Sequence, residues 1–541
     1  MYFGNKKEVM AAYFSYICNI NFCYMEKNVF TFSKDGSKEY SASIVKIGEL
    51  IPIEGSDFLA KTVVDGEDIV IRKDEVNPGD IMIYARIETV LDPEFLRANN
   101  LYEFGERERN SNYQEVQSLL DSGKEEEAKR KVGFFNKHGR VKMIKLRGCP
   151  SKGFLFTKEA LVKWDPSLSD VNLEDYIDDL PYFDSINGRV FIKVYVPWTP
   201  LCRNHHGGRG REKKEPKFDI LIPGQFNLHY DTQSINKEIH NFSPDDKVSI
   251  SVKLHGTSIC IGNVLIKKLK SFSKVESLFN KIRKKEYQKA RKLSRTSRRL
   301  SEREFWANKS EILKSKIKPG YSIGYGVVYS SRKVIKNQYI NKKVTGGYYG
   351  TDVWADYYKL LKGCIPPGYE LFGEIVGYVS GSQTYIQKGY DYKCKPGENK
   401  LMIYRVSIQD GDKKRELDVP EVLEFSKELV KNNPSLKGKI HHIDLLWNGS
   451  LHDLYPNIPV DENWHSEVLK SLKEDKDHFG MECDEPLNHK KMPREGIVIR
   501  KDGDPICEAY KLKCSNFLLL ESKAIDKGEI DIEMSEGYGC N

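Results

Sequence analysis

A lysine at the end of a predicted strand is the side chain of this sequence best suited to chemistry. Apolar and polar residues alternate over 248–252, which predicts a strand with one buried face and leaves Lys253 on the other face. Gly256 follows where backbone would approach a ligand closely. A lysine amine is a nucleophile only when neutral, and fewer than about one in a thousand is neutral at pH 7. Burial and nearby positive charge favour that neutral form. K-x-x-G alone remains a weak signal.

Further segments follow Lys253 in an order that is hard to attribute to chance. Lys511 and Lys513 are two residues apart, so a strand would place both on one face, where they could supply positive charge. Each segment alone could be an ordinary strand with exposed charges. The segments are SVKLHGTS (251–258), YSSRK (329–333), YELFGEIVG (369–377) with LMIYRV (401–406), REGIVIR (494–500) and YKLK (510–513).

Together these segments resemble the motifs of the covalent nucleotidyltransferases, which include DNA ligases, RNA ligases and mRNA capping guanylyltransferases. The resemblance covers residues 245–523. His-Gly-Thr after Lys253 is similar to the RNA-ligase form of the first motif, whereas DNA ligases usually have Asp-Gly. The β-rich N-terminal region is similar to Deinococcus-type RNA ligases, which place an OB-like domain ahead of the ligase domain. Only 28 residues follow Lys513, too few for the OB domain that DNA ligases and capping enzymes usually carry there.

The resemblance implies an α+β chain in which a small β-barrel (OB-like) domain precedes an antiparallel-sheet nucleotidyltransferase (ATP-grasp-like ligase) domain. It also implies an ATP-dependent RNA ligase that uses Mg²⁺ or Mn²⁺. Lys253 would take AMP from ATP, the AMP would pass to a 5′-phosphate, and a 3′-hydroxyl of RNA would displace it, sealing a nick. The alternatives are a GTP-dependent capping guanylyltransferase, a DNA ligase, and a non-catalytic RNA-binding scaffold.

The resemblance also implies roles for individual residues. The expected catalytic residues are Lys253, Glu495, Lys511 and Lys513. The expected ATP-binding residues are Val252, His255, Gly256, Arg332, Glu374, Tyr404, Lys511 and Lys513. Glu495 and Glu374 are the expected metal ligands, and Tyr404 would stack on adenine unless it simply packs in the core. The residues expected to contact RNA are Thr257, Lys284, Lys285, Arg291 and Arg298. Glu370 is expected to be a solvated strand residue.

Composition indicates several domains. The 541 residues are enough for two to four, with boundaries expected at an extension (1–35), the OB-like domain (36–165), a connector (166–240), the nucleotidyltransferase domain (241–525) and an acidic tail (526–541). Strand-like runs occupy 44–47, 69–71 and 81–84, and a polar helical stretch occupies 110–131. Residues 140–147 alternate basic with apolar, which predicts a half-buried strand with a basic exposed face.

A basic insertion at 267–318 is the main charge asymmetry. It holds 19 Lys or Arg against 5 Glu, a net charge of +14, whereas the whole chain carries +8. Apolar residues at three- and four-residue steps predict a helix there. A solvated charged helix is one interpretation, and contact with nucleic-acid phosphates is the favoured one. We expect a monomer that binds RNA-containing duplexes without reading bases.

Other signals favour an intracellular, cytoplasmic protein. The eleven cysteines include no C-x-x-C pair, so neither a disulfide framework nor a zinc ribbon is expected. The apolar patch at 10–25 contains two asparagines and lacks a small-residue cleavage site, so it does not favour a signal peptide. No later run is long enough to span a membrane. The loop at 205–211 is expected to be solvated, and its His pair lacks the partners of a zinc site.

Overall fold

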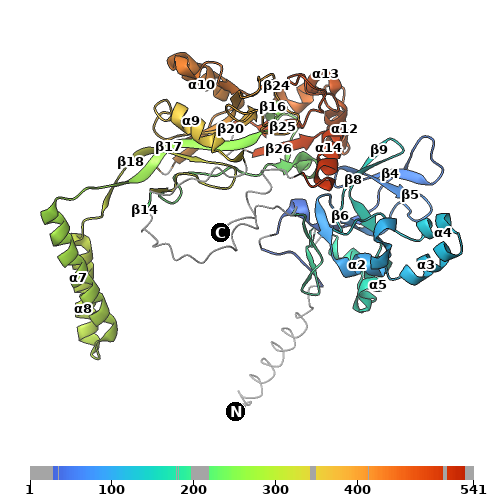
Figure 1. The fold of residues 1–541 in the computed structure, drawn as a ribbon, viewed down its shortest axis with the longest axis horizontal. Coiled ribbons are helices and arrows are strands. Elements are labelled where there is room, and N and C mark those ends of the chain that lie inside the picture. Colours follow the sequence, from blue (N-terminus) through green and yellow to red (C-terminus); the bar gives the residue numbers. More distant parts are fainter. Residues whose placement is uncertain are drawn as a thin grey trace, which may run out of the picture.

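A computed structural model describes residues 29–34, 36–177, 180, 182–196, 218–340, 349–411, 413–503 and 508–529. These residues form an N-terminal domain, a C-terminal domain and a helical hairpin that projects from the latter (Figure 1). The expectations for residues 1–28, for the loop at 205–211 and for the tail after 529 lie outside the described residues.

The N-terminal domain is built from short, mostly antiparallel strands, as the sequence predicts. The sheets β10-β6-β2 and β3-β4-β5 carry the expected strands. The bounds are β1 (Phe30–Thr31), β2 (Ala42–Lys46), β3 (Ile51–Pro52), β4 (Leu59–Val64), β5 (Glu67–Arg72), β6 (Ile81–Ala85), β7 (Thr89–Leu91), β8 (Met143–Leu146), β9 (Cys149–Lys152) and β10 (Phe154–Phe156). From the stretch expected as a connector, β11 (Ser185–Ile186), β12 (Arg189–Val190) and β13 (Ile192–Val194) pair with β1, with each other or with β7.

Short helices complete this domain. The polar stretch at 110–131 forms two helices, α3 (Tyr113–Asp121) and α4 (Glu125–Arg130), joined by a turn at Gly123, which has a positive φ of 73°. α2 (Pro93–Ala98) is capped by Asp92, whose side chain accepts hydrogen bonds from the amides of residues 94 and 95. α5 (Lys158–Trp164) packs against α2. Aromatic side chains dominate the core, including Phe95, Phe156 and Phe191.

The prediction of an exposed basic face on residues 140–147 was wrong for Arg140. Arg140 is buried and donates hydrogen bonds to Glu88, to Asp526 and to the carbonyl oxygen of Ser522. Lys142 also donates to Asp526, at 3.1 Å. Ser522 and Asp526 belong to α14 (Ser515–Asp526), so this face joins the N-terminal domain to the C-terminal helix. Strand alternation reveals which residues share a face but not what covers that face.

The C-terminal domain contains two largely antiparallel sheets, as predicted. One has the order β15-β26-β25-β16-β24 and the other the order β18-β17-β20-β21-β22, with β23 beside β21. The bounds are β15 (Gln233–Ser234), β16 (Lys247–Lys253), β17 (Thr257–Leu269), β18 (Tyr321–Ser330), β20 (Tyr369–Gly377), β21 (Asn399–Asp410), β22 (Lys413–Glu416), β23 (Ile440–His442), β24 (Leu445–Ser450), β25 (Gly496–Lys501) and β26 (Glu508–Lys513). A small sheet pairs β14 (Phe218–Asp219) with β19 (Tyr339–Ile340).

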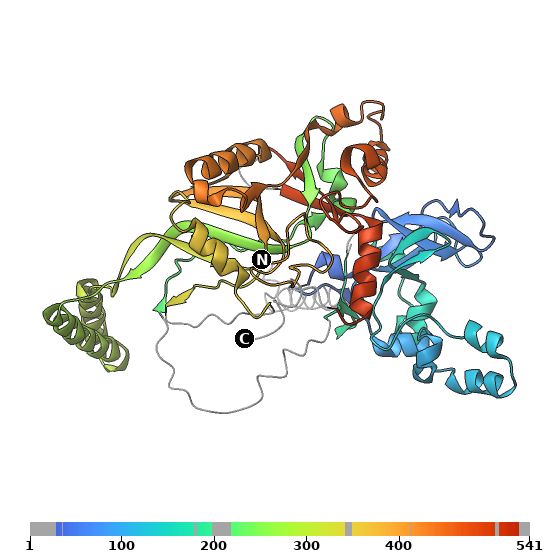
Figure 2. The same cartoon turned by 45° about the horizontal axis from the view of Figure 1, so that its top comes forward.

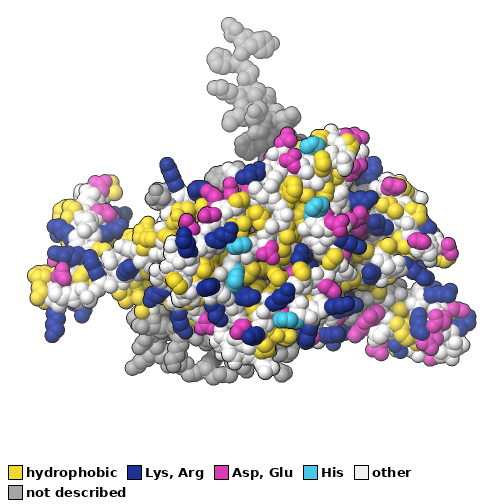
Figure 3. Space-filling model, turned by 90° about the horizontal axis from the view of Figure 1, so that it is seen from above, with side chains coloured by type: hydrophobic (Ala, Val, Ile, Leu, Met, Phe, Trp, Pro, Cys, Tyr) yellow, Lys and Arg dark blue, Asp and Glu magenta, His cyan; other side chains and the backbone are white. Residues whose placement is uncertain are grey.

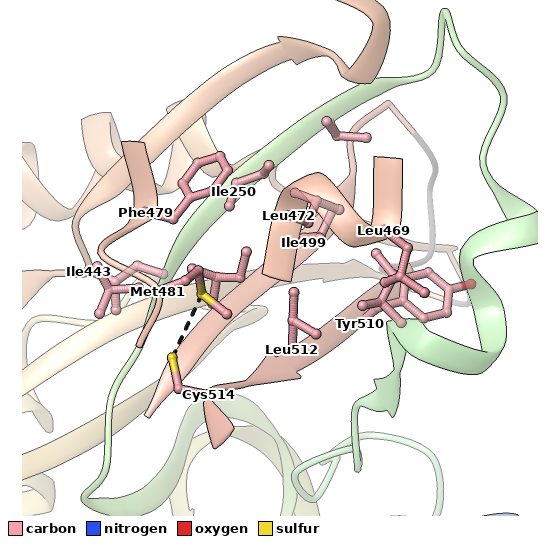
Figure 4. Close-up of a cluster of buried hydrophobic side chains, with 14 of the residues drawn as sticks. Ile250, Ile443, Leu469, Leu472, Phe479, Met481, Ile499, Tyr510, Leu512 and Cys514 are labelled. Carbon is pink, nitrogen blue, oxygen red and sulfur yellow. Dashed lines mark hydrogen bonds between the residues drawn. The ribbon is translucent and has the colours of Figure 1, made fainter. Parts of the chain in front are cut away.

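The strand that carries Lys253 is held by a core on one face. Ile250 of β16 packs near Ile499 of β25 and Leu512 of β26, and Leu472 of α12 (Trp464–Glu474) belongs to the same cluster (Figure 4). The second sheet has its own core, to which α9 (Val353–Leu361) and α10 (Val419–Asn432) contribute Trp354 and other residues. Short helices α6 (Ile235–Glu238), α11 (Leu451–Leu454) and α13 (Lys476–Phe479) complete this domain.

The basic insertion forms α7 (Lys274–Thr296) and α8 (Leu300–Lys316), which pack on each other at the end of the paired strands β17 and β18. Ser273 begins α7 with a capping box to Glu276. The hairpin projects away from the two domains (Figures 1 and 2). Its apolar stripe is exposed, with Val275 63% and Leu278 59% accessible. No helix among the described residues has the length and apolar character to cross a membrane.

Candidate active site

A cavity of about 370 Å³ lies where both sheets of the C-terminal domain meet the N-terminal domain. The C-terminal domain lines it with Lys253 of β16 and with residues of β20, β21, β25 and β26. The N-terminal domain contributes Glu39, Tyr40 and Glu88. Strand alternation explains this part of the lining, because Val248 and Ile250 point into the core while Ser251 and Lys253 face the cavity.

Lys253 and Glu495 form the central ion pair of the cavity. Nζ of Lys253 donates to Oε1 of Glu495 at 2.7 Å. Strand pairing brings them together, because Lys253 lies opposite Gly496, the residue after Glu495. Lys513 pairs with Gly496 from the other side, and its Nζ lies 3.7 Å from the same oxygen. Before Lys253 can act as a nucleophile, its ammonium group must lose a proton and break the hydrogen bond to Glu495.

Glu495 stays ionised because its cationic neighbours outweigh its burial. Burial raises the pKa of this carboxyl, but Lys253, Lys513 and His255 lower it further, and the resulting pKa is about 2. Oε2 of Glu495 is buried and has no hydrogen-bond partner among the described residues, although Nδ1 of His255 lies 3.8 Å away. This free carboxylate oxygen suits a divalent cation, which prefers oxygen ligands.

Lys511 lies on the same face of β26 as Lys513 and lines the cavity. Burial lowers the pKa of Lys511, Glu39 opposes that shift, and the cations Lys513, Lys253 and Arg332 reinforce it. Lys513 is anchored by Glu521 of α14, with Nζ 3.2 Å from Oε1. The two lysines therefore concentrate positive charge beside Lys253, which suits a phosphate ligand.

Glu374 holds the loop after Lys253. Its Oε1 accepts from the amide of Gly256 at 3.1 Å, and its Oε2 accepts from Oγ of Ser258 at 3.2 Å. These contacts engage both oxygens of a residue that the resemblance assigned to ATP and to the metal. Among the described residues no cluster of three or more His, Cys, Asp or Glu could hold a metal ion. A cation here would therefore take Glu495 and ligand phosphates rather than a protein cage.

Tyr404 and Arg332 also line the cavity. Oη of Tyr404 lies 2.9 Å from Nδ1 of His229, and Arg332 donates to Asp231 through Nε at 3.1 Å. Val252, His255 and Gly256 also line the cavity. The structure thus brings together all the residues that the resemblance assigned to catalysis and ATP.

Several residues that line the cavity were not predicted from the sequence. His229, Tyr230 and Asp231 come from the stretch expected to be a connector, and the N-terminal domain adds Glu39, Tyr40 and Glu88. Arg500 lay inside a recognised segment but was not singled out. It is 4% exposed and lines the cavity, and its Nη2 donates to the carbonyl oxygen of Leu417. Its Nε and Nη1 have no partner among the described residues, so both can serve a ligand.

Other expected residues lie elsewhere. Thr257 is 2% exposed and is not among the residues that line the cavity. The four expected phosphate contacts Lys284, Lys285, Arg291 and Arg298 are exposed on the hairpin and not in the cavity. The prediction of a solvated Glu370 was wrong, because Glu370 is fully buried and accepts hydrogen bonds from the backbone and side chain of Asn227. Burial raises the pKa of Glu370.

Comparisons with known proteins match both domains of the chain. Residues 246–513 match the family model described as RNA ligase, and residues 41–158 match a model of an OB-fold domain. No curated protein matches the chain. Solved structures of the Naegleria gruberi RNA ligase are similar. An apo mutant has 15% identity over 90% of this chain and 98% of its own, with a TM-score of 0.44. A mutant with ATP and Mn has 16% identity over 88% and 98%, with a TM-score of 0.43.

The N-terminal match identifies the strand-rich domain as an OB fold, ahead of the antiparallel sheets that carry Lys253 and Glu495. The C-terminal match spans every strand of the C-terminal domain that lines the cavity, from β16 to β26. Residues 246–513 belong to the RNA ligase family and follow an OB-fold domain at residues 41–158.

Proposed function

We propose that the protein is an ATP-dependent RNA ligase that carries AMP on Lys253. The observation that carries this proposal is the placement of Lys253 beside the Glu495 carboxylate, in a cavity that also contains Lys511 and Lys513. This is the arrangement that attack by an amine on a phosphate needs. The nucleophile faces an anion-binding site, and cations surround the phosphorus that would gain negative charge.

The first step forms a phosphoramidate. The amine of Lys253, after losing a proton to solvent, attacks the α-phosphorus of ATP, and the bond to pyrophosphate breaks. Lys511 and Lys513 neutralise charge on the α-phosphate as the transition state develops. Glu495 would hold Mg²⁺ or Mn²⁺ through its unpartnered Oε2. When bound, the cation supplies positive charge to the phosphates and eases the departure of pyrophosphate.

The next steps join RNA. An oxygen of a 5′-phosphate attacks the same phosphorus, the P–N bond breaks, and a 5′-5′ pyrophosphate forms. A 3′-hydroxyl of RNA then attacks the 5′-phosphate, losing its proton as AMP leaves. We propose that the substrate is a nick in a duplex that contains RNA.

Other cavity residues would bind the nucleotide. Tyr404 offers an aromatic face to adenine, and Arg332 and His255 would position sugar or phosphate. The unpartnered Nε and Nη1 of Arg500 add donors to the same cavity. Glu374 would act mainly through the loop that it holds.

The helical hairpin would hold the nucleic acid. Its Lys284, Lys285, Arg291 and Arg298 are exposed, and the lobe at the left of Figure 3 displays Lys and Arg side chains beside hydrophobic ones. Such a surface suits phosphates and reads no base sequence.

Labelling with α-labelled nucleotide tests the proposal. With Mg²⁺ present, wild-type protein should take label from ATP rather than GTP, and mass spectrometry should find AMP on Lys253. The Lys253→Ala protein should bind RNA but take no label. Label from GTP alone would favour a capping enzyme, equal sealing of all-DNA nicks a DNA ligase, and unlabelled but RNA-binding wild type a scaffold.

A further inference from the structure

The loop that links Lys253 to β17 is held by side chains from outside the loop. The amide of His255 donates to Oη of Tyr392 at 2.7 Å. Nε2 of Gln387 donates to the carbonyl oxygen of Gly256 at 2.9 Å, while Glu374 accepts the Gly256 amide. Gly256 is packed so closely that an added Cβ would lie 2.4 Å from the carbonyl oxygen of residue 375. The backbone after the lysine therefore has little freedom to shift.

Of these three anchors, Glu374 lies in a recognised motif, whereas Gln387 and Tyr392 lie outside the motifs, in the segment between β20 and β21. The Tyr392 side chain is buried in the core cluster beneath β16. Burial raises the pKa of Tyr392, so its hydroxyl stays protonated and accepts through a lone pair. The neighbouring Tyr390 packs edge-on against the ring of His255, with centroids 5.0 Å apart.

The backbone that presents Tyr392 is strained. Tyr392 and Lys393 have φ angles of 46° and 56°, in the left-handed region that side chains other than glycine seldom adopt. Neighbouring groups hold this conformation. Oδ1 of Asn488 accepts from the amides of Asp391 and Tyr392 at 3.1 and 3.0 Å, and Oδ1 of Asp391 accepts from the amide of Lys393 at 2.9 Å. Two consecutive strained residues, held by these three hydrogen bonds, indicate that the position of Tyr392 is important to the site.

We propose that Tyr392 is a positioning residue for the Lys253 nucleophile. By accepting the His255 amide, its hydroxyl orients the turn that begins at Lys253. It thereby directs the lysine amine at Glu495 and at the phosphate site, and directs the His255 ring towards Oε2 of Glu495. This inference rests on the proposed function, because it assumes that Lys253 accepts AMP.

The Tyr392→Phe substitution removes only the hydroxyl and leaves the His255 amide without its acceptor. The Tyr357→Phe substitution is the matched control. Tyr357 lies on α9, is also buried, and loses a comparable bond, from Oη to Oδ1 of Asn399 at 2.7 Å. It does not line the cavity.

Single-turnover labelling by α-labelled ATP measures the nucleophile directly. For Tyr392→Phe we expect the rate at saturating ATP to fall about 10- to 100-fold with the ATP KM within about threefold of wild type, because the hydroxyl acts on the attacking amine rather than on ATP binding. Joining of RNA that already carries the 5′-5′ pyrophosphate does not use the amine, so its rate should stay within about threefold. Tyr357→Phe should leave both rates near wild type.

The outcomes separate this inference from the proposed function. If wild-type protein takes no label, the proposed function fails. If wild type is labelled and Tyr392→Phe is labelled equally fast, the positioning role is wrong. It is also wrong if both reactions of Tyr392→Phe slow equally, because a general structural defect would act on both.

Discussion

Oε1 of Glu495 accepts a hydrogen bond from Nζ of Lys253 at 2.7 Å and lies 3.7 Å from Nζ of Lys513. One carboxylate oxygen thus lies between two lysines, while the other oxygen has no hydrogen-bond partner among the described residues. The pair orients the amine before ATP enters, and the second oxygen keeps an unused acceptor that suits a cation.

Replacing Glu495 with Gln should lower the rate of AMP transfer to Lys253 by about 10²- to 10³-fold, because the amide carries no charge to orient the amine or bind a cation. Single-turnover labelling by α-labelled ATP measures this rate. Asp475→Asn is a suitable control, since the Asp475 side chain is 7% exposed and hydrogen-bonded to Tyr455 but does not line the cavity. A Glu495→Gln protein labelled as fast as wild type would contradict the assigned role.

Glu495 should also make stability depend on pH. Its pKa in the folded protein is about 2, below the ordinary value of 4.5, so the ionised form stabilises the fold. That contribution, about 3 kcal/mol, is complete above pH 4.5 and is lost as pH falls towards 2. Urea unfolding of wild type and Glu495→Gln should show a difference that is constant from pH 7 to 5 and narrows below 4.5. A difference that widens on acidification would contradict this.

Replacing Lys284, Lys285, Arg291 and Arg298 with Ala should weaken binding to RNA duplexes about tenfold or more at low salt. Each lost phosphate contact should make the slope of log Kd against log salt shallower by about 0.9. Labelling by ATP should not change, since none of the four lines the cavity. Fluorescence anisotropy at several salt concentrations measures the effect.

The matched control for the hairpin removes Lys124, Lys129, Arg130 and Lys131 around α4, where Lys129 is already paired with Glu125 and Glu126. Binding that weakens equally in both variants would indicate a general effect of net charge and not a specific role for the hairpin.

Replacing Arg140 with Met should lower the free energy of unfolding by about 3 kcal/mol or more, because it leaves Glu88 and Asp526 without a buried cationic partner. Lys142→Met should cost less than about 1 kcal/mol, since that lysine makes a more exposed ion pair with Asp526. Urea unfolding distinguishes the two. Equal effects would show that Arg140 does not join the N-terminal domain to α14.

The sequence by itself determined the nature of the site. Alternation over 248–252 predicts the strand of Lys253, the two-residue spacing of Lys511 and Lys513 predicts their common face, and the order of the motifs indicates the chemistry. These features are local, because side-chain direction along a strand follows from backbone geometry alone. The short strands of the N-terminal domain were predictable for the same reason.

Only the tertiary structure decided what each face meets. The alternation of residues 140–147 predicts an exposed Arg140, yet α14 buries this side chain. The apolar stripe of α7, in contrast, is exposed. Tyr392 reaches the His255 amide from 137 residues away, and no local pattern records that contact. Burial and hydrogen bonding depend on how distant segments pack, so strand and helix periodicity identify the face of a residue but not its partner.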